Sequence, residues 1–384
     1  MMENNTWKEY RFSEFVNINP SVSLKANEEY SFVEMKDLED GNKYCFPKIK
    51  KIKGGGAKFQ NGDTLFARIT PCLENGKICQ VKGLENNLGF GSTEFYVFRG
   101  KEDISDTEFV YYLSRWNDVR DHAEINLDGT SGRQRVPKAC FDDLLITMPP
   151  LPEQKAIASV LSSLDDKIDL LQQQNQTLEA LAETLFRQWF IEEAKEDWEE
   201  KPLSSIANFL NGLACQKYPP KDNINKLPVL KIKELTAGIT DNSDWATTEV
   251  KPEYIVKNGD VIFAWSASLM VKIWNGEDCI LNQHLFKVTS NEFPKWFYYF
   301  WCKQHLREFI SIAQSHATTM GHIKRSDLDE AMVLVPDNDE IDRMTVQMNP
   351  ILDKIQLNNN QINSLSKLRD TLLPKLISGE VKIK

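Results

Sequence analysis

Two long stretches of this chain are similar to one another, and they constrain its fold more than any other feature. The first is residues 149–190 and the second is residues 335–381, and a shift of about 187 positions superposes them. Three leucines recur at that shift without a gap, as Leu178, Leu181 and Leu185 in the first stretch and as Leu365, Leu368 and Leu372 in the second. The similarity indicates a duplicated element of structure.

Each stretch carries apolar residues at alternating steps of four and three, a spacing that keeps one side of a helix against a partner helix. We expect this seam to consist of Ile157, Leu161, Leu164, Ile168, Leu171, Leu178 and Leu185 in the first stretch, and of Met344, Met348, Ile351, Ile355, Ile362, Leu365 and Leu372 in the second. An asparagine on each seam, Asn175 and Asn358, can fix the register of a coiled coil. The sequence therefore predicts two helices of about 57 Å each. The alternative is a pair of surface helices packed on a core, which we weigh lower because ordinary helices average about 12 residues.

The composition is that of an ordinary soluble protein. The 384 residues suffice for two or three domains, with 41% apolar and 27% charged residues. No apolar run approaches the ~20 residues that span a bilayer, and the polar N-terminus predicts no signal peptide. The seven cysteines form no Cys-x-x-Cys pair. We therefore expect reduced thiols in a cytoplasmic protein and no metal site.

The net charge of −10 argues against a nucleic-acid-binding protein if it is taken alone. The distribution of charge is more informative, because six lysines and no acid lie between Lys43 and Lys58. An acidic chain with such local basic patches can bind DNA, more easily when partner proteins supply further positive charge.

The segments that precede the two long stretches also repeat one another. NGDTLFAR at 61–68 recurs as NGDVIFAW at 258–265, and the strand-like STEFYVF has its counterpart in LNQHLFKV at 281–288. The polar loop DGTSGRQRV at 128–136 recurs, with small gaps, as HATTMGHIKRSDL at 316–328. We therefore predict an α+β chain built as a tandem repeat, with a mixed α/β domain at 1–150, a helix at 151–192, a second domain at 193–336 and a second helix at 337–384.

The sequence lacks the usual motifs of catalysis. It has no GxxxxGK[ST] loop for nucleotide phosphates and no Asp/Asn-Pro-Pro-aromatic motif of base methylation. Asp165, Asp166 and Lys167 superficially match part of a metal-nuclease motif, but we expect them on the polar side of the first long helix. Glu153 and Gln154 more plausibly begin that helix than catalyse a reaction. We expect a non-catalytic chain.

Polar loops at matching places in the two domains are the candidates for DNA contacts, because their residue types bind base edges or phosphates. In the first domain they are Lys51, Lys53, Arg68, Thr70, Asn75, Lys77, Arg133, Gln134 and Arg135. In the second they are Ser266, Ser268, Asn282, Gln283, His284, Thr318, Thr319, His322 and Lys324, with Arg325 beside them. For any single residue a solvated loop is the alternative, and the lysine run is equally well explained as a solvated strand edge. The tryptophans, Trp245 and Trp265 among them, are more typical of core than of base stacking.

PPLPEQKAIASVLSSLDDKI and LRDTLLPKLISGEV closely resemble the repeated helical regions of the specificity (S) subunits, or HsdS, of bacterial type I restriction-modification enzymes. The resemblance covers the whole chain, although the second copy has Pro336-Asp337-Asn338-Asp339-Glu340 in place of Pro-Leu-Pro-Glu-Gln. It implies two target-recognition domains, each reading half of a bipartite double-stranded DNA target. It also implies that the helices form an antiparallel coiled coil that sets the spacer and docks two methyltransferase (M) subunits.

The resemblance further implies motor-nuclease (R) subunits that join the complex for restriction. S-adenosylmethionine, ATP and magnesium would then be cofactors of the partner subunits, and this chain would bind none of them. One alternative is a scaffold whose coiled coil joins two protein-binding domains without binding DNA. Another is the recognition half of a single-chain enzyme, which the missing methylase motifs disfavour.

Overall fold

The structure is a computed structural model that describes residues 7–130, 132–240, 242–315 and 321–383. Contacts divide the chain into two compact units: unit 1 is Met1–Leu171 with Ser364–Lys384, and unit 2 is Gln172–Asn363. Each unit combines one mixed domain with part of both long helices. Within the described residues, no helix is long and apolar enough to cross a membrane.

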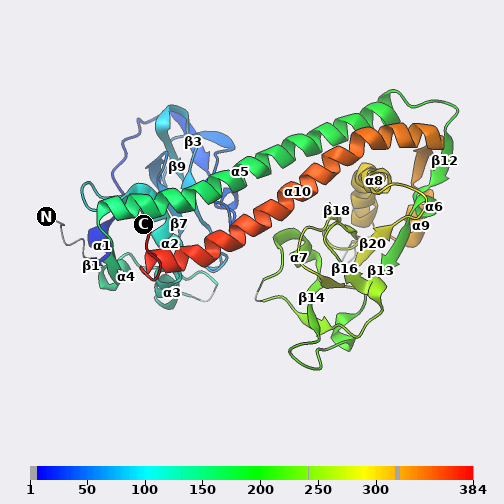
Figure 1. Ribbon diagram of the computed structural model, residues 1–384. Coiled ribbons are helices and arrows are strands. Elements are labelled where there is room, and N and C mark those ends of the chain that lie inside the picture. The colour runs from blue at the N-terminus through cyan, green and yellow to red at the C-terminus, as the bar shows by residue number, and fades with distance from the viewer. Residues whose placement is uncertain (1–6, 131, 241, 316–320, 384) are drawn as a thin grey trace. The chain divides into compact units, whose positions relative to one another are not determined.

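The described part of unit 1 contains three sheets and four short α-helices, drawn from blue to cyan-green in Figure 1. Its strands are β1 (Lys8–Arg11), β2 (Val16–Ile18), β3 (Glu29–Val33), β4 (Tyr44–Cys45), β5 (Ile49–Ile52), β6 (Lys58–Gln60), β7 (Thr64–Ala67), β8 (Ile78–Val81), β9 (Leu88–Gly91), β10 (Phe95–Gly100) and β11 (Leu145–Met148). Its short helices are α1 (Phe12–Phe15), α2 (Thr107–Arg115), α3 (Asn117–Ile125) and α4 (Cys140–Asp143). The sheets have the orders β1-β11, β2-β10-β7-β8-β4 and β5-β3-β9-β6.

Unit 2 repeats this topology, which confirms the tandem duplication. Its strands are β12 (Glu199–Pro202), β13 (Asn208–Asn211), β14 (Lys226–Leu230), β15 (Trp245–Thr247), β16 (Ile255–Val256), β17 (Val261–Ala264), β18 (Met270–Ile273), β19 (Cys279–Leu281), β20 (Leu285–Thr289) and β21 (Met332–Val335). Its helices are α6 (Leu203–Ile206), α7 (Ile232–Ala237), α8 (Lys295–Ser315) and α9 (Arg325–Glu330). The sheet orders β12-β21, β13-β20-β17-β18 and β15-β14-β19-β16 match those of unit 1 strand for strand, apart from the extra edge strand β4. Even the parallel pairs correspond, since β3 pairs with β9 as β14 pairs with β19.

The repeated Asn-Gly-Asp motif forms the turn that begins the central strand of each domain. Gly62 and Gly259 have φ values of 89° and 91°, which a residue with a side chain rarely adopts. The aspartate that follows each glycine accepts a hydrogen bond from the backbone three residues earlier, at 2.8 Å in both domains. Asp63 also pairs with Arg99 at 2.6 Å. The motif therefore fixes where β7 and β17 start, and so where they end.

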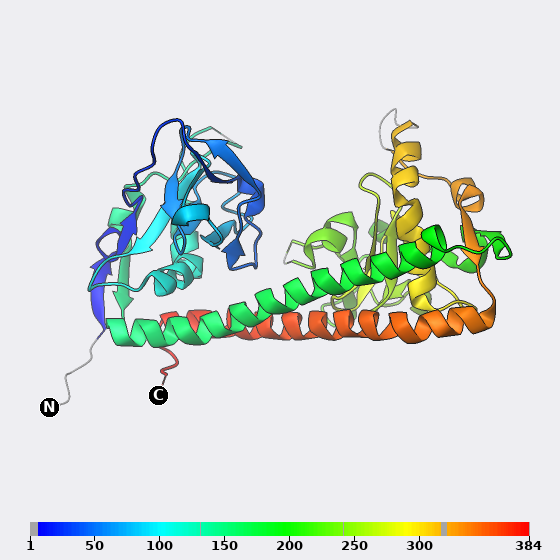
Figure 2. The same ribbon diagram turned by 90° about the horizontal axis from the view of Figure 1, so that it is seen from above.

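The two long helices are α5 (Leu151–Arg187), followed by a π-helical turn at Gln188–Glu192, and α10 (Asn338–Ile377). Within each unit they lie side by side and run in opposite directions (Figure 1; Figure 2). In unit 2, Asn175 donates to Asn359 Oδ1 at 2.7 Å and accepts from Asn358 Nδ2 at 2.9 Å. The seam asparagines thus bond to each other across the helix pair, although Asn358 Oδ1 is buried without a hydrogen-bond partner among the described residues.

The predicted seam residues are all buried or half-buried. Several of them also belong to the domain cores. Ile157 and Leu161 pack in unit 1 with Phe12, Leu376 and other buried residues. In unit 2 the buried residues of α5 and α10 in the same core as the aromatic residues of α8 are Ala182, Phe186, Ile341, Met348, Ile351 and Ile355. The long helices therefore pair with each other and also pack on the domain cores, so the alternative of surface helices on a core is correct for part of their length.

One expectation about α5 is wrong. Asp165 does not lie on the polar side of the helix, since its side chain is only 1% exposed and accepts a hydrogen bond from Arg369 Nη1 of α10 at 2.7 Å. Its other oxygen accepts from the Tyr112 hydroxyl at 2.6 Å. The carboxylate is buried because a guanidinium is buried with it, and local helical periodicity cannot reveal that pairing.

The start of each long helix is held by the same contact in both units. Trp7 Nε1 donates to Glu153 Oε2 at 3.3 Å, and Trp198 Nε1 donates to Glu340 Oε2 at 2.7 Å. The second helix therefore keeps the glutamate although the rest of its Pro-Glu-Gln motif is missing. Gln154 is buried and donates to the carbonyls of Ile104 and Pro149. The Pro-Glu-Gln motif therefore has a structural role at the start of α5.

Candidate nucleic-acid interface

Part of the candidate set gathers at the ends of β7 and β17, where a polar loop crosses the strand end. In unit 1, Arg68 follows β7, its N–H donates to Glu94 O at 3.0 Å, and its carbonyl accepts from Val136 N at 2.8 Å. In unit 2, Trp265 follows β17 and makes the same two bonds, with His284 O at 3.4 Å and Ile323 N at 3.1 Å. Isolated bridges join Ile69 to Arg135 and Ser266 to His322. Three positions therefore correspond: Arg68 with Trp265, Glu94 with His284, and Arg135 with His322.

The unit 1 cluster contains two arginines with different surroundings. Arg135 donates to both oxygens of Glu94, with Nε to Oε2 at 2.9 Å and Nη2 to Oε1 at 2.7 Å. These hydrogen bonds hold the pKa of the Glu94 carboxyl below its usual value, and the charge of Arg68 contributes to the same shift. Arg68 forms no ion pair with a carboxylate of the described residues, and its guanidinium lies over the Tyr96 ring, 4.7 Å from the centroid.

The unit 2 cluster is built from the aromatic rings of Trp265, His284 and His322. Trp265 stacks on Phe286 with centroids 5.6 Å apart and donates to Asn211 Oδ1 at 3.2 Å. His284 and His322 lie 6.1 and 6.2 Å from the Trp265 ring. The same framework therefore presents different chemistry in the two units.

Several candidates are buried and shape these loops from within. Thr70 Oγ1 accepts from Gln134 N at 3.1 Å, which ties the loop after β7 to the loop at 128–136. Ser266 Oγ lies 3.1 Å from His284 Nδ1, and Asn282 Oδ1 accepts from His284 N at 3.3 Å. Each of these three side chains, Thr70, Ser266 and Asn282, is less than 8% exposed, so they position their neighbours.

The lysine run is largely neutralised by acids of the same domain. Lys51, on the edge strand β5, lies 3.6 Å from Glu34 and over the Phe32 ring. Lys50 pairs with Glu85. Lys53 follows β5 and is half-buried. Lys77 is tethered inside the domain, because its ammonium donates to the carbonyls of Met35 and Leu38 at 2.8 and 3.0 Å.

The remaining candidates divide into surface residues and residues that the structure does not describe. Asn75, Arg133, Ser268 and Lys324 are exposed, Gln134 and Gln283 are half-buried, and Gln283 Nε2 lies 3.3 Å from His284 Nε2. Thr318 and Thr319 lie outside the described residues.

Sequence reasoning missed several members of these clusters. Trp265 was assigned to the core, yet it is only half-buried at the strand end, and Trp245 is 40% exposed. Glu94 and Tyr96 were not selected either. Glu94 immediately precedes β10 and its carbonyl accepts from Arg68 N, one residue beyond the end of β7. Tyr96 comes two residues after Glu94, so strand alternation puts both side chains on one face.

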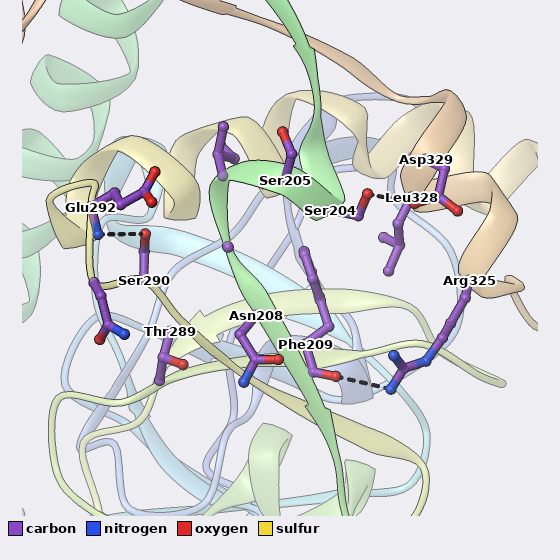
Figure 3. A pocket seen from close by; sticks show the side chains of 13 residues that line it. Ser204, Ser205, Asn208, Phe209, Thr289, Ser290, Glu292, Arg325, Leu328 and Asp329 are labelled. Carbon is purple, nitrogen blue, oxygen red and sulfur yellow. Dashed lines mark hydrogen bonds between the residues drawn. The ribbon is translucent and has the colours of Figure 1, made fainter.

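A separate polar pocket of about 600 Å³ lies in unit 2 beside α6 and α9, and Figure 3 shows it from close by. Arg325 Nη2 donates to Phe209 O at 3.3 Å across this pocket, and Ser204 is hydrogen-bonded to Asp329. Two carboxylates, Glu292 and Asp329, also line the pocket, and Asp329 lies on the same helix as Arg325, which makes the pocket a poor anion site.

The repeated domains, with their polar strand-end clusters and shared helix pair, define a protein with two like recognition modules. The chain belongs to the family described as "Type I restriction modification DNA specificity domain", which matches residues 4–180 and 195–367. The match covers both domains and most of both helices, so it supports the resemblance found in the sequence.

The chain is similar to several curated specificity subunits. The chain is 31% identical over 205 residues to the type I restriction enzyme EcoAI specificity subunit of Escherichia coli, a match that covers 50% of this chain but only 35% of that protein. It is 26% identical to the MjaIX specificity subunit of Methanocaldococcus jannaschii, covering 72% of this chain and 69% of the relative. It is 22% identical to the HindI specificity subunit of Haemophilus influenzae, covering 98% and 99%.

Among solved structures, the crystal structure of a type I restriction-modification S subunit from M. genitalium has a similar fold. The TM-score is 0.55 at 15% identity, and the match covers 98% of this chain and 97% of that one.

Proposed function

We propose that this chain is the sequence-specific DNA-binding subunit of a type I restriction-modification complex, in which each domain reads one half of a bipartite double-stranded target. The observation that carries the proposal is the pair of strand-end clusters, which occupy corresponding positions on one repeated framework but differ in chemistry. Two domains that share one fold but present different side chains are suited to a DNA target whose two halves differ in sequence.

The chain itself is non-catalytic in this proposal. Two methyltransferase subunits dock on the helix pair, and motor-nuclease subunits join them for restriction in the cytoplasm. S-adenosylmethionine, ATP and magnesium belong to those partners. The duplication supports two copies of one partner, since each unit presents an equivalent part of the helix pair.

Exchanging the first domain tests independent reading. Residues 1–148 are replaced by the matching domain of a relative, and the methylated sequence is mapped in a host that also expresses the methyltransferase partner. One half of the recognised sequence should change and the other should stay the same. A change in both halves would contradict independent reading, and a chain that protects no DNA in a footprint would favour the scaffold alternative.

The helix pair is the proposed ruler between the half-sites, because α5 and α10 are the segments that continue from one unit into the other. Four residues inserted within 172–174 of α5, with four opposite them in α10 between Asn359 and Asn360, lengthen the pair by about 6 Å. Base pairs rise about 3.4 Å.

The preferred spacer should therefore grow by one or two base pairs while both half-site sequences stay the same. Insertion of a single residue at the same points is the control. It rotates the helix by about 100° and should disrupt pairing instead. Methylation mapping gives the spacer, and an unchanged spacer with full activity would exclude the helices as the ruler.

A further inference from the structure

Arg68 has a buried side-chain donor and a backbone held by hydrogen bonds on both sides. No carboxylate of the described residues pairs with its guanidinium. Its Nε is buried and has no hydrogen-bond partner among the described residues. The backbone on both sides is pinned by the bonds to Glu94 O and Val136 N. Because Nε is covered by the protein, the two Nη groups are the side-chain donors of Arg68 left for a ligand.

The orientation of the Arg68 guanidinium is set by Tyr96. The ring lies under the guanidinium at 4.7 Å, and the Tyr96 hydroxyl is itself fixed by donating to Val136 O at 2.7 Å. A stacked guanidinium has lost much of its rotational freedom before it meets a ligand. Little further entropy is then lost when its planar fork of donors binds.

Glu94 would be the natural partner of Arg68, because the two residues are joined by a backbone hydrogen bond just beyond the ends of the adjacent strands β7 and β10. Arg135 occupies both oxygens of this carboxylate instead. The Arg135–Glu94 pair is thus a positioning pair, which leaves the neighbouring guanidinium of Arg68 available.

We infer that Arg68 is the guanine-reading residue of the first domain, donating two hydrogen bonds to O6 and N7 of a guanine in the major groove. This inference rests on the proposed function. The arginine fork matches that base edge better than any other. The comparison between the units argues against a phosphate contact, because the corresponding residue in unit 2 is Trp265, which carries no charge and whose indole N–H already donates to Asn211 Oδ1. A phosphate anchor that seats the duplex would need a donor or cation in both domains, whereas a base-reading position is free to differ.

The test selects duplexes from a randomised double-stranded DNA library with the purified full chain, alone and with its methyltransferase partner. The wild-type chain should select a bipartite sequence with a guanine in one half-site that Arg68→Met no longer requires. Methionine keeps the aliphatic contact with Tyr96 and removes the fork. Discrimination against the other bases at that position should fall by about 5- to 150-fold, as expected for one bidentate pair.

Arg68→Lys separates base reading from phosphate binding. A lysine can replace an arginine at a phosphate, but its ammonium lacks the planar fork that stacks on Tyr96. Arg68→Lys should therefore keep the affinity for DNA of any sequence while its guanine preference falls below that of the wild type. An equal loss of affinity for all sequences in Arg68→Met, or loss of affinity without any change of base preference in Arg68→Lys, would overturn the inference. Trp265→Ala is the matched control and should alter only the other half-site.

The role of the positioning pair has its own test. Arg135→Ala should release Glu94 to pair with Arg68, so the guanine preference should fall although Arg68 is intact. Adding Glu94→Gln to Arg135→Ala should restore it, whereas damage to the loop alone would not be rescued. If the wild-type chain selects no sequence at all, the proposed function fails; if it selects two half-sites and neither depends on Arg68, this inference alone fails.

Discussion

The buried ion pair between Asp165 and Arg369 should be one of the most sensitive points of unit 1. The two side chains are 1% and 4% exposed, and they lie 2.7 Å apart. Removing one partner of a buried pair typically costs 3–5 kcal/mol, because the other charge stays buried without compensation. In Asp165→Leu the guanidinium keeps the Gly41 carbonyl at 2.8 Å and the exposed Asp370 at 2.9 Å. We therefore expect a loss of about 3 kcal/mol, at the lower end of that range.

The repeat supplies the compensating variant. At the 187-residue shift, Leu352 corresponds to Asp165 and Ala182 corresponds to Arg369, so unit 2 has apolar residues where unit 1 has the pair. Apolar replacement of a whole buried pair is often neutral. The double variant Asp165→Leu with Arg369→Ala should therefore lie within about 2 kcal/mol of the wild type. Arg369→Ala alone should cost at least about 3 kcal/mol, because it leaves Asp165 with only the Tyr112 hydroxyl.

Hydrogen exchange resolved by peptide during denaturant titration is the suitable assay, because unit 2 then serves as an internal reference. Peptides of α2 should lose protection in the single variants, while peptides of α8 should not. The reasoning would be refuted by single variants that cost less than about 1 kcal/mol, or by a double variant whose cost equals the sum of the two.

Two further predictions concern stability. Ala267 has a φ of 57°, a left-handed conformation that strains a residue with a side chain, so Ala267→Gly should stabilise unit 2 by about 0.5–1 kcal/mol in chemical denaturation. The control Ala264→Gly, within strand β17, should destabilise it by a similar amount, and equal effects of both would contradict the argument. Leu376→Ala should destabilise unit 1 by about 2–5 kcal/mol, because this residue near the end of α10 is buried in the core of unit 1. Leu368→Ala, at a 46%-exposed position on the same helix, should change stability by less than about 0.5 kcal/mol, and a large effect there would show that exposure does not decide the outcome.

The sequence by itself determined the elements whose signals are local or repeated. Heptad spacing is a property of neighbouring residues, so it predicted both long helices and the asparagines that pair between them. Self-similarity predicted that two domains share one topology, and the Asn-Gly-Asp turn marked the start of the central strand in each. The family motifs added the expectation of DNA recognition, which no local physical signal in an acidic chain would have supplied.

Only the tertiary structure decided which polar groups meet. The sequence predicted Asp165 on the polar face of α5, because the spacing of residues within α5 carries no sign of its partner. That partner, Arg369, is 204 positions away in the chain. In the sequence, Arg68 and Arg135 are two similar loop arginines. In the structure, the pairing of β7 with β10 places Glu94 where Arg135 binds it, and Arg68 stacks on Tyr96 instead. The lysine run is a basic patch in the sequence, but in the fold Glu85 and Glu34 form ion pairs with two of its lysines, Lys50 and Lys51. In each case the free energy of a charged group depends on what lies within a few ångströms in space, and folding sets that distance between residues far apart in the chain.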